Sequence, residues 1–196
     1  MRQAHNNRLS PKGLFMSSTN NASRFTATIP HESALSDIAH LLISHLPSNA
    51  CVALHGDLGA GKTTFVKKLA SGMGLDESTI VSPTFGLIHI HDSLAIDPPV
   101  RLVHADFYRL SALDQLREVG WDDAISARSE TRVWTFVEWP ERIASALPQN
   151  HIRVSIDITS ETTRRLTFCC SGTSHLACMH ALYTSTLHKE SETNDS

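Results

Sequence analysis

The residues Gly56-Asp57-Leu58-Gly59-Ala60-Gly61-Lys62-Thr63-Thr64 match the pattern G-x-x-x-x-G-K-[ST] of a phosphate-binding P-loop. Just before them, the apolar run 51–55 is typical of a buried parallel strand. After them, apolar residues recur at helical spacing over 65–70, with Lys67 and Lys68 on the opposite face. This order of strand, glycine-rich loop and helix is the context that the motif requires. The sequence therefore predicts an α/β protein that binds a nucleoside triphosphate.

The chemistry of this loop follows from its residue types. Glycines allow a tight turn in which successive backbone N–H groups point inward, toward phosphate oxygens. The helix that begins near Lys62 adds its positive end and its unpaired N–H groups. We expect Lys62 to reach the β- and γ-phosphates, and the hydroxyl of Thr63 to bind Mg²⁺.

Length and composition limit the class of protein. The chain has 196 residues, of which 41% are hydrophobic and 19% charged, as expected of one globular domain. Its net charge of −3 gives no electrostatic basis for binding DNA or RNA unaided. It contains no apolar run of the roughly 18 residues that a membrane span needs, and residues 1–24 lack the apolar core of a secretory signal.

The remaining pattern predicts how the domain is organised. Residues 1–24 and 186–196 are polar, so we expect an unstructured extension and tail around one P-loop domain at 25–185. The predicted fold is a mixed, mostly parallel sheet flanked by helices. The alternating segments 151–157 and 165–169 are expected to form an antiparallel hairpin at its end.

Two acids follow apolar runs at the points where strands should end. Asp106 closes the run 100–106, and Glu138 closes the run 132–138. Carboxyl ends of parallel strands border the ligand crevice of such sheets, so both side chains are candidates for holding Mg²⁺ or orienting water. The hydroxyls of Ser82-Pro83-Thr84 lie between two predicted strands and are candidates for sensing a γ-phosphate.

Cysteine and histidine gather near the C-terminal end of the predicted domain. The residues concerned are Cys169, Cys170, His175, Cys178 and His180. Their spacing matches no common zinc pattern, so we favour reduced thiols in a strand and a following helix over a metal site. Together with Cys51 in the predicted core strand, this usage indicates the cytoplasm.

Combined with the P-loop, three further segments resemble the TsaE (YjeE) family, the small ATPases of bacterial tRNA threonylcarbamoyladenosine synthesis. They are S-P-T-F at 82–85, H-A-D-F-Y-R-L at 104–110 and V-E-W-P at 137–140, and the resemblance covers roughly residues 28–170. It implies a slow Mg²⁺-dependent ATPase that supports TsaB-like and TsaD-like partners in modifying adenosine 37 of tRNAs reading codons that begin with A. Contact with tRNA is expected only through those partners, and none with membranes or DNA.

The resemblance also implies roles for individual residues. Lys62, Asp106 and Glu138 would be catalytic, and Thr63, Asp106 and Glu138 would contact Mg²⁺. Nucleotide contacts would come from residues 57–64, from Thr84 and Trp139, from Glu32 near the base, and from Arg164 in the terminal hairpin. The chain departs from the family pattern at both ends, and it lacks the glycine expected just before Arg164.

Two other functions use the same loop. A small-molecule kinase would need a lid supplying arginines over the phosphates, but region 111–130 carries only Arg117 and Arg128. A nucleotide-gated interaction module would use ATP binding rather than turnover. Removing the Glu138 carboxylate separates the ATPase from the module, because a module would keep its function.

Overall fold

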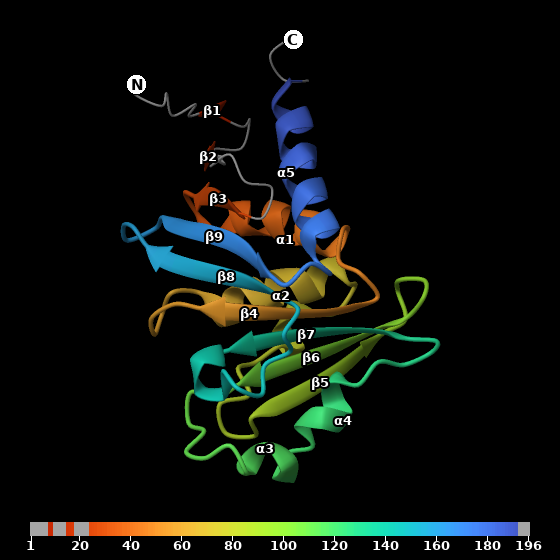
Figure 1. Ribbon diagram of the computed structural model, residues 1–196. Helices are drawn as coiled ribbons and strands as arrows, with labels where there is room; N and C mark the ends of the chain where they lie inside the picture. Colours follow the sequence, from red (N-terminus) through yellow and green to blue (C-terminus); the bar gives the residue numbers. More distant parts are fainter. Residues whose placement is uncertain (1–7, 10–14, 18–23, 192–196) are drawn as a thin grey trace.

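One mixed sheet forms the centre of the molecule (Figure 1). The computed structural model describes residues 8–9, 15–17 and 24–191, and in this part of the chain nine strands follow the order β1-β2-β3-β9-β8-β4-β7-β6-β5. Strands β8, β4, β7 and β6 run parallel, and antiparallel pairs complete both ends. The strands are β1 (Arg8–Leu9), β2 (Phe15–Ser17), β3 (Arg24–Ile29), β4 (Asn49–His55), β5 (Ile88–Ser93), β6 (Val100–Asp106), β7 (Arg132–Glu138), β8 (His151–Ile158) and β9 (Arg164–Ser171). The predicted fold class, including the terminal hairpin β8–β9, is confirmed.

Helices cover both faces of this sheet. The helical elements are η1 (Glu32–Ala34), α1 (Leu35–Ile43), α2 (Lys62–Gly72), η2 (Glu77–Thr79), α3 (Gln115–Glu118), α4 (Trp121–Ile125), η3 (Pro140–Ile143) and α5 (Leu176–Ser191). Alternation along β4 divides the core between the two faces. Val52 and Leu54 pack with residues of α1, α2 and α5, whereas Cys51 packs with Trp121 of α4 and Ile143 of η3.

Two central strands end side by side at acidic residues. Strands β6 and β7 are parallel and in register from Val100↔Arg132 to Asp106↔Glu138. Their bounds coincide with the two predicted apolar runs. As a result, both carboxylates lie at the carboxyl ends of these strands, next to the loop that follows β4.

The P-loop needs glycine at its first position. Gly56 has a φ of 148°, and a Cβ at this residue would lie 2.6 Å from the carbonyl oxygen of Ile156 in β8. Any side chain would therefore push the loop away from the neighbouring strand. The close approach fixes where the glycine-rich turn leaves the sheet.

The chain ends were expected to be unstructured. Within residues 1–24 the structure describes two short strands and the start of β3, with β2 paired to β3; the other residues before Arg24 lie outside the described part. Helix α5 continues to Ser191, into the expected tail, and residues 192–196 are not described.

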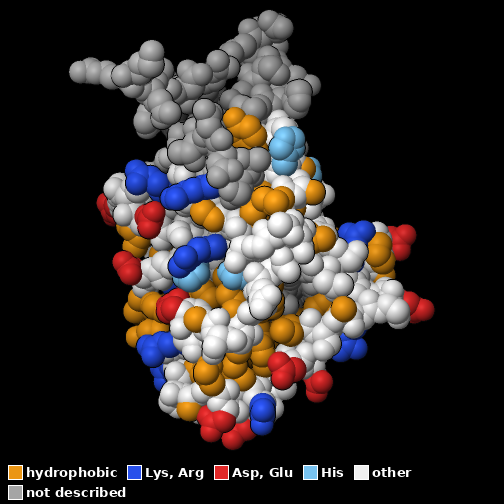
Figure 2. Space-filling view, in the orientation of Figure 1, with side chains coloured by type: hydrophobic (Ala, Val, Ile, Leu, Met, Phe, Trp, Pro, Cys, Tyr) orange, Lys and Arg blue, Asp and Glu red, His pale blue; other side chains and the backbone are white. Residues whose placement is uncertain are grey.

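The surface carries mixed charge. On the face in Figure 2, Lys and Arg side chains are interspersed with Asp and Glu. None of the described helices is both long and apolar enough to cross a bilayer.

Cys169 and Cys170 lie in β9 and Cys178 lies in α5, as predicted, and none forms a disulfide. Within the described ranges, no three His, Cys, Asp or Glu side chains are grouped to hold a metal ion.

Candidate functional site

The backbone of the P-loop forms a turn suited to an anion. Gly59 and Gly61 have φ values of 79° and 105°, in the left-handed region that favours glycine. Helix α2 begins directly after them at Lys62, and its first i→i−4 bond joins the Phe65 amide to the Gly61 carbonyl at 2.9 Å. Earlier amides of the helix thus lack helical partners and point out of its positive end, as an oxyanion requires.

Lys62 is held inside this turn. Its side chain is buried, and Nζ donates hydrogen bonds to the carbonyl oxygens of Gly56 at 2.7 Å and Asp57 at 2.9 Å. The ammonium also lies 4.1 Å from the centre of the Trp139 ring, a cation–π contact. Burial lowers the pKa of Lys62 from its ordinary value, while the carboxylates of Glu138 and Asp106 oppose the shift. The cation is therefore placed for a ligand with negative charge.

Trp139 is positioned by an unusual backbone. Its φ of 57° and ψ of 48° place it in the left-handed region, immediately before Pro140 begins η3. The Trp139 ring packs against Tyr108, with 4.8 Å between ring centres. Because a left-handed conformation is costly for a residue with a side chain, its presence between Glu138 and η3 marks this turn as a candidate functional element.

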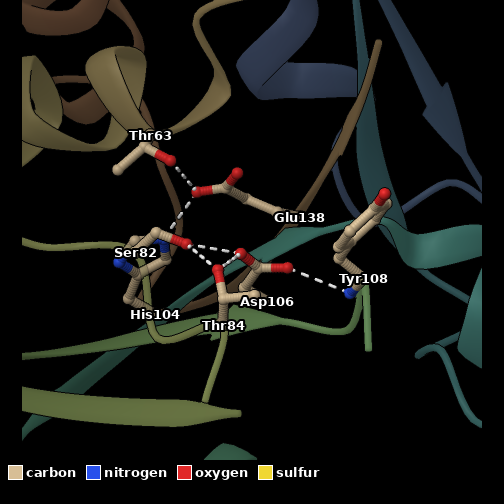
Figure 3. A network of polar contacts seen from close by, with 7 residues as sticks. All are labelled: Thr63, Ser82, Thr84, His104, Asp106, Tyr108 and Glu138. Carbon is tan, nitrogen blue, oxygen red and sulfur yellow. Dashed lines mark hydrogen bonds and ion pairs between the residues drawn. The ribbon is translucent and has the colours of Figure 1, made fainter. Parts of the chain in front are cut away.

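Glu138 joins the P-loop helix to the sheet (Figure 3). One oxygen of this buried carboxylate, Oε1, accepts hydrogen bonds from Thr63 Oγ1 at 2.7 Å and from His104 Nε2 at 2.9 Å. While Thr63 donates its hydrogen, its oxygen keeps lone pairs that a metal ion can use. The arrangement therefore leaves both residues able to serve a cation.

Asp106 is bonded to a different segment. Its Oδ2 accepts hydrogen bonds from the hydroxyls of Ser82 and of Thr84, the latter at 2.6 Å, and its Oδ1 accepts from the Tyr108 amide at 3.0 Å (Figure 3). The two hydroxyl oxygens are 2.6 Å apart. Asp106 thus ties the loop after η2 to the carboxyl end of β6.

Two cavities meet at the P-loop. One of about 520 Å³ brings together the predicted phosphate and metal residues. Its lining includes Leu58, Lys62, Thr63, Thr84, Asp106, Glu138 and Trp139. The other, of about 320 Å³, is lined by Glu32, Ala60, Ile156 and Arg164, and Gly59, Gly61 and Thr64 border both.

Glu32 and Arg164 therefore lie apart from the carboxylates, across the P-loop. Arg164 Nε donates a hydrogen bond to the Ala60 carbonyl at 3.1 Å, so the terminal hairpin braces the loop. Its guanidinium also donates to the carbonyls of residues 160, 161 and 163 within its own turn. The first cavity thus contains the predicted phosphate and metal residues, and the second contains the predicted nucleotide contacts Glu32 and Arg164.

Sequence reasoning missed His104 as a site residue. A usable signal was present, since His104 lies two positions before Asp106 in the same strand and so shares its face. The roles proposed for the other residues remain predictions. Their chemistry fits the two ligands, because a hydroxyl and two carboxylates supply the oxygen atoms that Mg²⁺ prefers, and the loop amides with Lys62 suit phosphates.

Fold and site together define a protein of the P-loop NTPase-like α/β class. A family model described as "Threonylcarbamoyl adenosine biosynthesis protein TsaE" matches residues 29–166. The chain belongs to the TsaE family.

Individual relatives agree with this assignment. The chain is 34% identical over 122 residues to the tRNA threonylcarbamoyladenosine biosynthesis protein TsaE of Treponema pallidum, covering 62% of this chain and 83% of the relative. It is 33% identical over 135 residues to the TsaE of Bacillus subtilis, covering 69% and 78%. The crystal structure of Bacillus subtilis YdiB superposes with a TM-score of 0.64 and 26% identity, covering 83% of this chain and 96% of that one.

Proposed function

We propose that this protein is the ATP-binding and ATP-hydrolysing subunit that supports TsaB-like and TsaD-like proteins in forming N6-threonylcarbamoyladenosine at position 37 of tRNA, in the cytoplasm. One observation carries the ATPase assignment. The hydroxyl of Thr63, next to the phosphate-binding lysine, is hydrogen-bonded to the strand-end carboxylate of Glu138. Lys62 and both of these residues line one cavity.

Binding of the triphosphate falls to the loop and its lysine. The amides at the start of α2 donate to phosphate oxygens, and Lys62 adds a positive charge in a site largely shielded from water. Mg²⁺ supplies charge neutralisation at the β- and γ-phosphates when it is bound. Thr63, Glu138 and Asp106 are the residues that would hold it.

Glu138 is best placed to act on the attacking water. Its Oε1 is occupied by Thr63 and His104, so Oε2 is the oxygen that has capacity to accept a proton or orient water. Asp106 instead anchors the hydroxyls of Ser82 and Thr84. That loop can therefore respond to the γ-phosphate and present a different surface to a partner in each nucleotide state.

Contact with tRNA is assigned to the partners rather than to this chain. Its net charge is −3, and basic and acidic side chains are mixed on the face in Figure 2. Unaided binding to RNA is driven mostly by the counterions that basic side chains release from the phosphates. That face offers no continuous basic surface that could release them.

Reconstitution tests the proposal. The full chain is mixed with its TsaB-like and TsaD-like proteins and an unmodified tRNA, and both ATP hydrolysis and threonylcarbamoyl transfer are measured. We expect slow hydrolysis by the chain alone, faster hydrolysis in the mixture, and transfer that stops when Lys62→Ala replaces the wild type. Multiple-turnover transfer that proceeds equally without this chain would contradict the proposal.

A further inference from the structure

His104 is a buried histidine with one polar contact. Its side chain has 0% exposure in strand β6, between β7 and the edge strand β5, and Nε2 lies 2.9 Å from Glu138 Oε1. The second ring nitrogen, Nδ1, is buried and has no hydrogen-bond partner among the residues that the structure describes. Every neighbour in the strand from Leu102 to Ala105 is apolar, so an apolar side chain would be the ordinary choice here.

The hydrogen bond to Glu138 determines which nitrogen of the His104 ring is the donor. An ionised carboxylate can only accept, so Nε2 must carry the hydrogen that it donates. Burying an imidazole with one nitrogen unsatisfied is unfavourable, and a purely structural role would be better served by a residue without polar atoms. The one hydrogen bond of the His104 ring is therefore made to the carboxylate of Glu138, and this contact is the best explanation for a histidine at this position.

We propose that His104 is a positioning residue that holds Glu138 in its working orientation. This inference rests on the proposed ATPase function. His104 fixes Oε1 from the rigid strand β6, and Thr63 fixes the same atom from helix α2 (Figure 3). With Oε1 held twice, rotation of the carboxylate is restricted, and Oε2 keeps one direction relative to the P-loop.

The expected effect is large because catalytic geometry tolerates little error. Displacing a reacting group by about 1 Å can lower the rate about 100-fold. Replacing His104 by phenylalanine keeps a flat ring of similar size but removes the donor. We expect kcat for ATP hydrolysis to fall on the order of 10- to 100-fold, whereas affinity for ADP without Mg²⁺ should change by less than about threefold.

Three variants test this. His104→Phe removes the donor, and His104→Gln restores an N–H near the position of Nε2. His91→Phe is the matched control, since His91 lies in the neighbouring strand β5 and also has a buried ring nitrogen without a hydrogen-bond partner among the described residues. For each protein we would measure kcat and KM, together with ADP affinity in Mg²⁺ and in EDTA. Thermal unfolding of each variant reports on folding.

The ADP affinities measured in Mg²⁺ and in EDTA test the role of His104 without relying on ATP turnover. A positioning role predicts that His104→Phe lowers kcat and reduces the gain in ADP affinity that Mg²⁺ gives, that His104→Gln restores both, and that His91→Phe changes neither. Equal loss of affinity with and without Mg²⁺, or no rescue by glutamine, would overturn the inference and leave the ATPase assignment standing. A wild type that binds ADP with Mg²⁺ but never hydrolyses ATP would defeat the ATPase instead, and the affinities would still decide the role of His104.

Discussion

Asp106 and Glu138 are direct register partners at the carboxyl ends of two parallel strands, yet they are hydrogen-bonded to different parts of the protein. Asp106 accepts from the loop hydroxyls of Ser82 and Thr84, and Glu138 accepts from Thr63 in the P-loop helix. Under the proposed function, the two neighbouring acids would have separate tasks. Changes on the Asp106 side should alter how the loop responds to the nucleotide, and changes to Glu138 should alter turnover.

Lys62→Ala should abolish tight nucleotide binding. The substitution removes a buried cation from the proposed phosphate site, where its charge-assisted contacts would stabilise the bound state by about 2–3 kcal/mol. This corresponds to a loss of affinity of about 30- to 150-fold. Isothermal titration with ATP measures it, with Lys67→Ala on the other face of α2 as the control. Unchanged affinity in a folded Lys62→Ala protein would refute the P-loop assignment.

Glu138→Gln should lower ATP hydrolysis on the order of 100-fold, with a smaller but measurable loss of MgATP affinity, because Glu138 is also a proposed Mg²⁺ ligand. The amide keeps the size of the side chain, but it cannot act as a base and stabilises a cation poorly. Single-turnover hydrolysis and equilibrium binding separate the two effects, and exposed Glu130→Gln is the control. Wild-type turnover in Glu138→Gln would remove the carboxylate from catalysis. Partner support that survives without turnover would favour the nucleotide-gated module.

The loop from Ser82 to Phe85 should differ between nucleotide states. Hydrogen exchange over residues 80–90 is expected to be slower with a non-hydrolysable ATP analogue than with ADP, because ADP lacks the γ-phosphate that would order the hydroxyls. Thr84→Ala removes one of the hydroxyls bonded to Asp106 and should shrink this difference while ADP affinity stays nearly constant. Thr79→Ala, in η2 before the loop, is the control. Equal exchange in both states would leave Ser82-Pro83-Thr84 as an ordinary turn.

Acid should destabilise the protein partly through His175. Its side chain is buried, and both ring nitrogens lack hydrogen-bond partners among the described residues. Burial, assisted by nearby His151, lowers the pKa of His175 below its ordinary value of 6.5. The unfolded chain therefore binds this proton more readily, so stability is complete above pH 6.5 and is lost as pH falls through the pKa of the folded state. One such group contributes at most about 1.4 kcal/mol per pH unit.

Urea unfolding at pH 7.5 and 5.5 measures this loss. The difference in the free energy of unfolding between the two pH values should be smaller in His175→Phe than in the wild type. His180 is exposed and lies in α5, which begins directly after His175, and His180→Phe should leave the difference unchanged. An undiminished difference in His175→Phe would assign the acid sensitivity elsewhere, first to His55 and His91, whose pKa values burial also lowers.

Local patterns predicted the elements around the P-loop well. Continuous apolar runs predicted the bounds of strands β6 and β7, so Asp106 and Glu138 could be placed at strand ends from sequence alone. The helical spacing of apolar residues predicted α2. Strand order could not be read this way, because pairing between β3 and β9 joins segments that are far apart in the sequence. For the same reason the shared cavity of Glu32 and Arg164 emerged only from the structure.

His104 shows a different limit of sequence reasoning. A histidine within an apolar run has no periodic signal that separates a buried donor from a solvated side chain. Its importance depends on the rotamer of a carboxylate 34 residues further along the chain. Residue spacing predicts which face a side chain occupies, but it does not predict which of two carboxylates that side chain will meet.

The insertion of β9 between β3 and β8 also governs how the chain can fold during synthesis. Strand β3 is made early, but its partner on this side, β9, leaves the ribosome only after about 140 further residues, as the pairing of Ile29 with Arg164 implies. Until then one edge of β3 remains open to wrong pairing. Closing so long a loop is entropically costly and slow. The last hairpin therefore completes the sheet and also sets the earliest moment at which a brace can reach the P-loop.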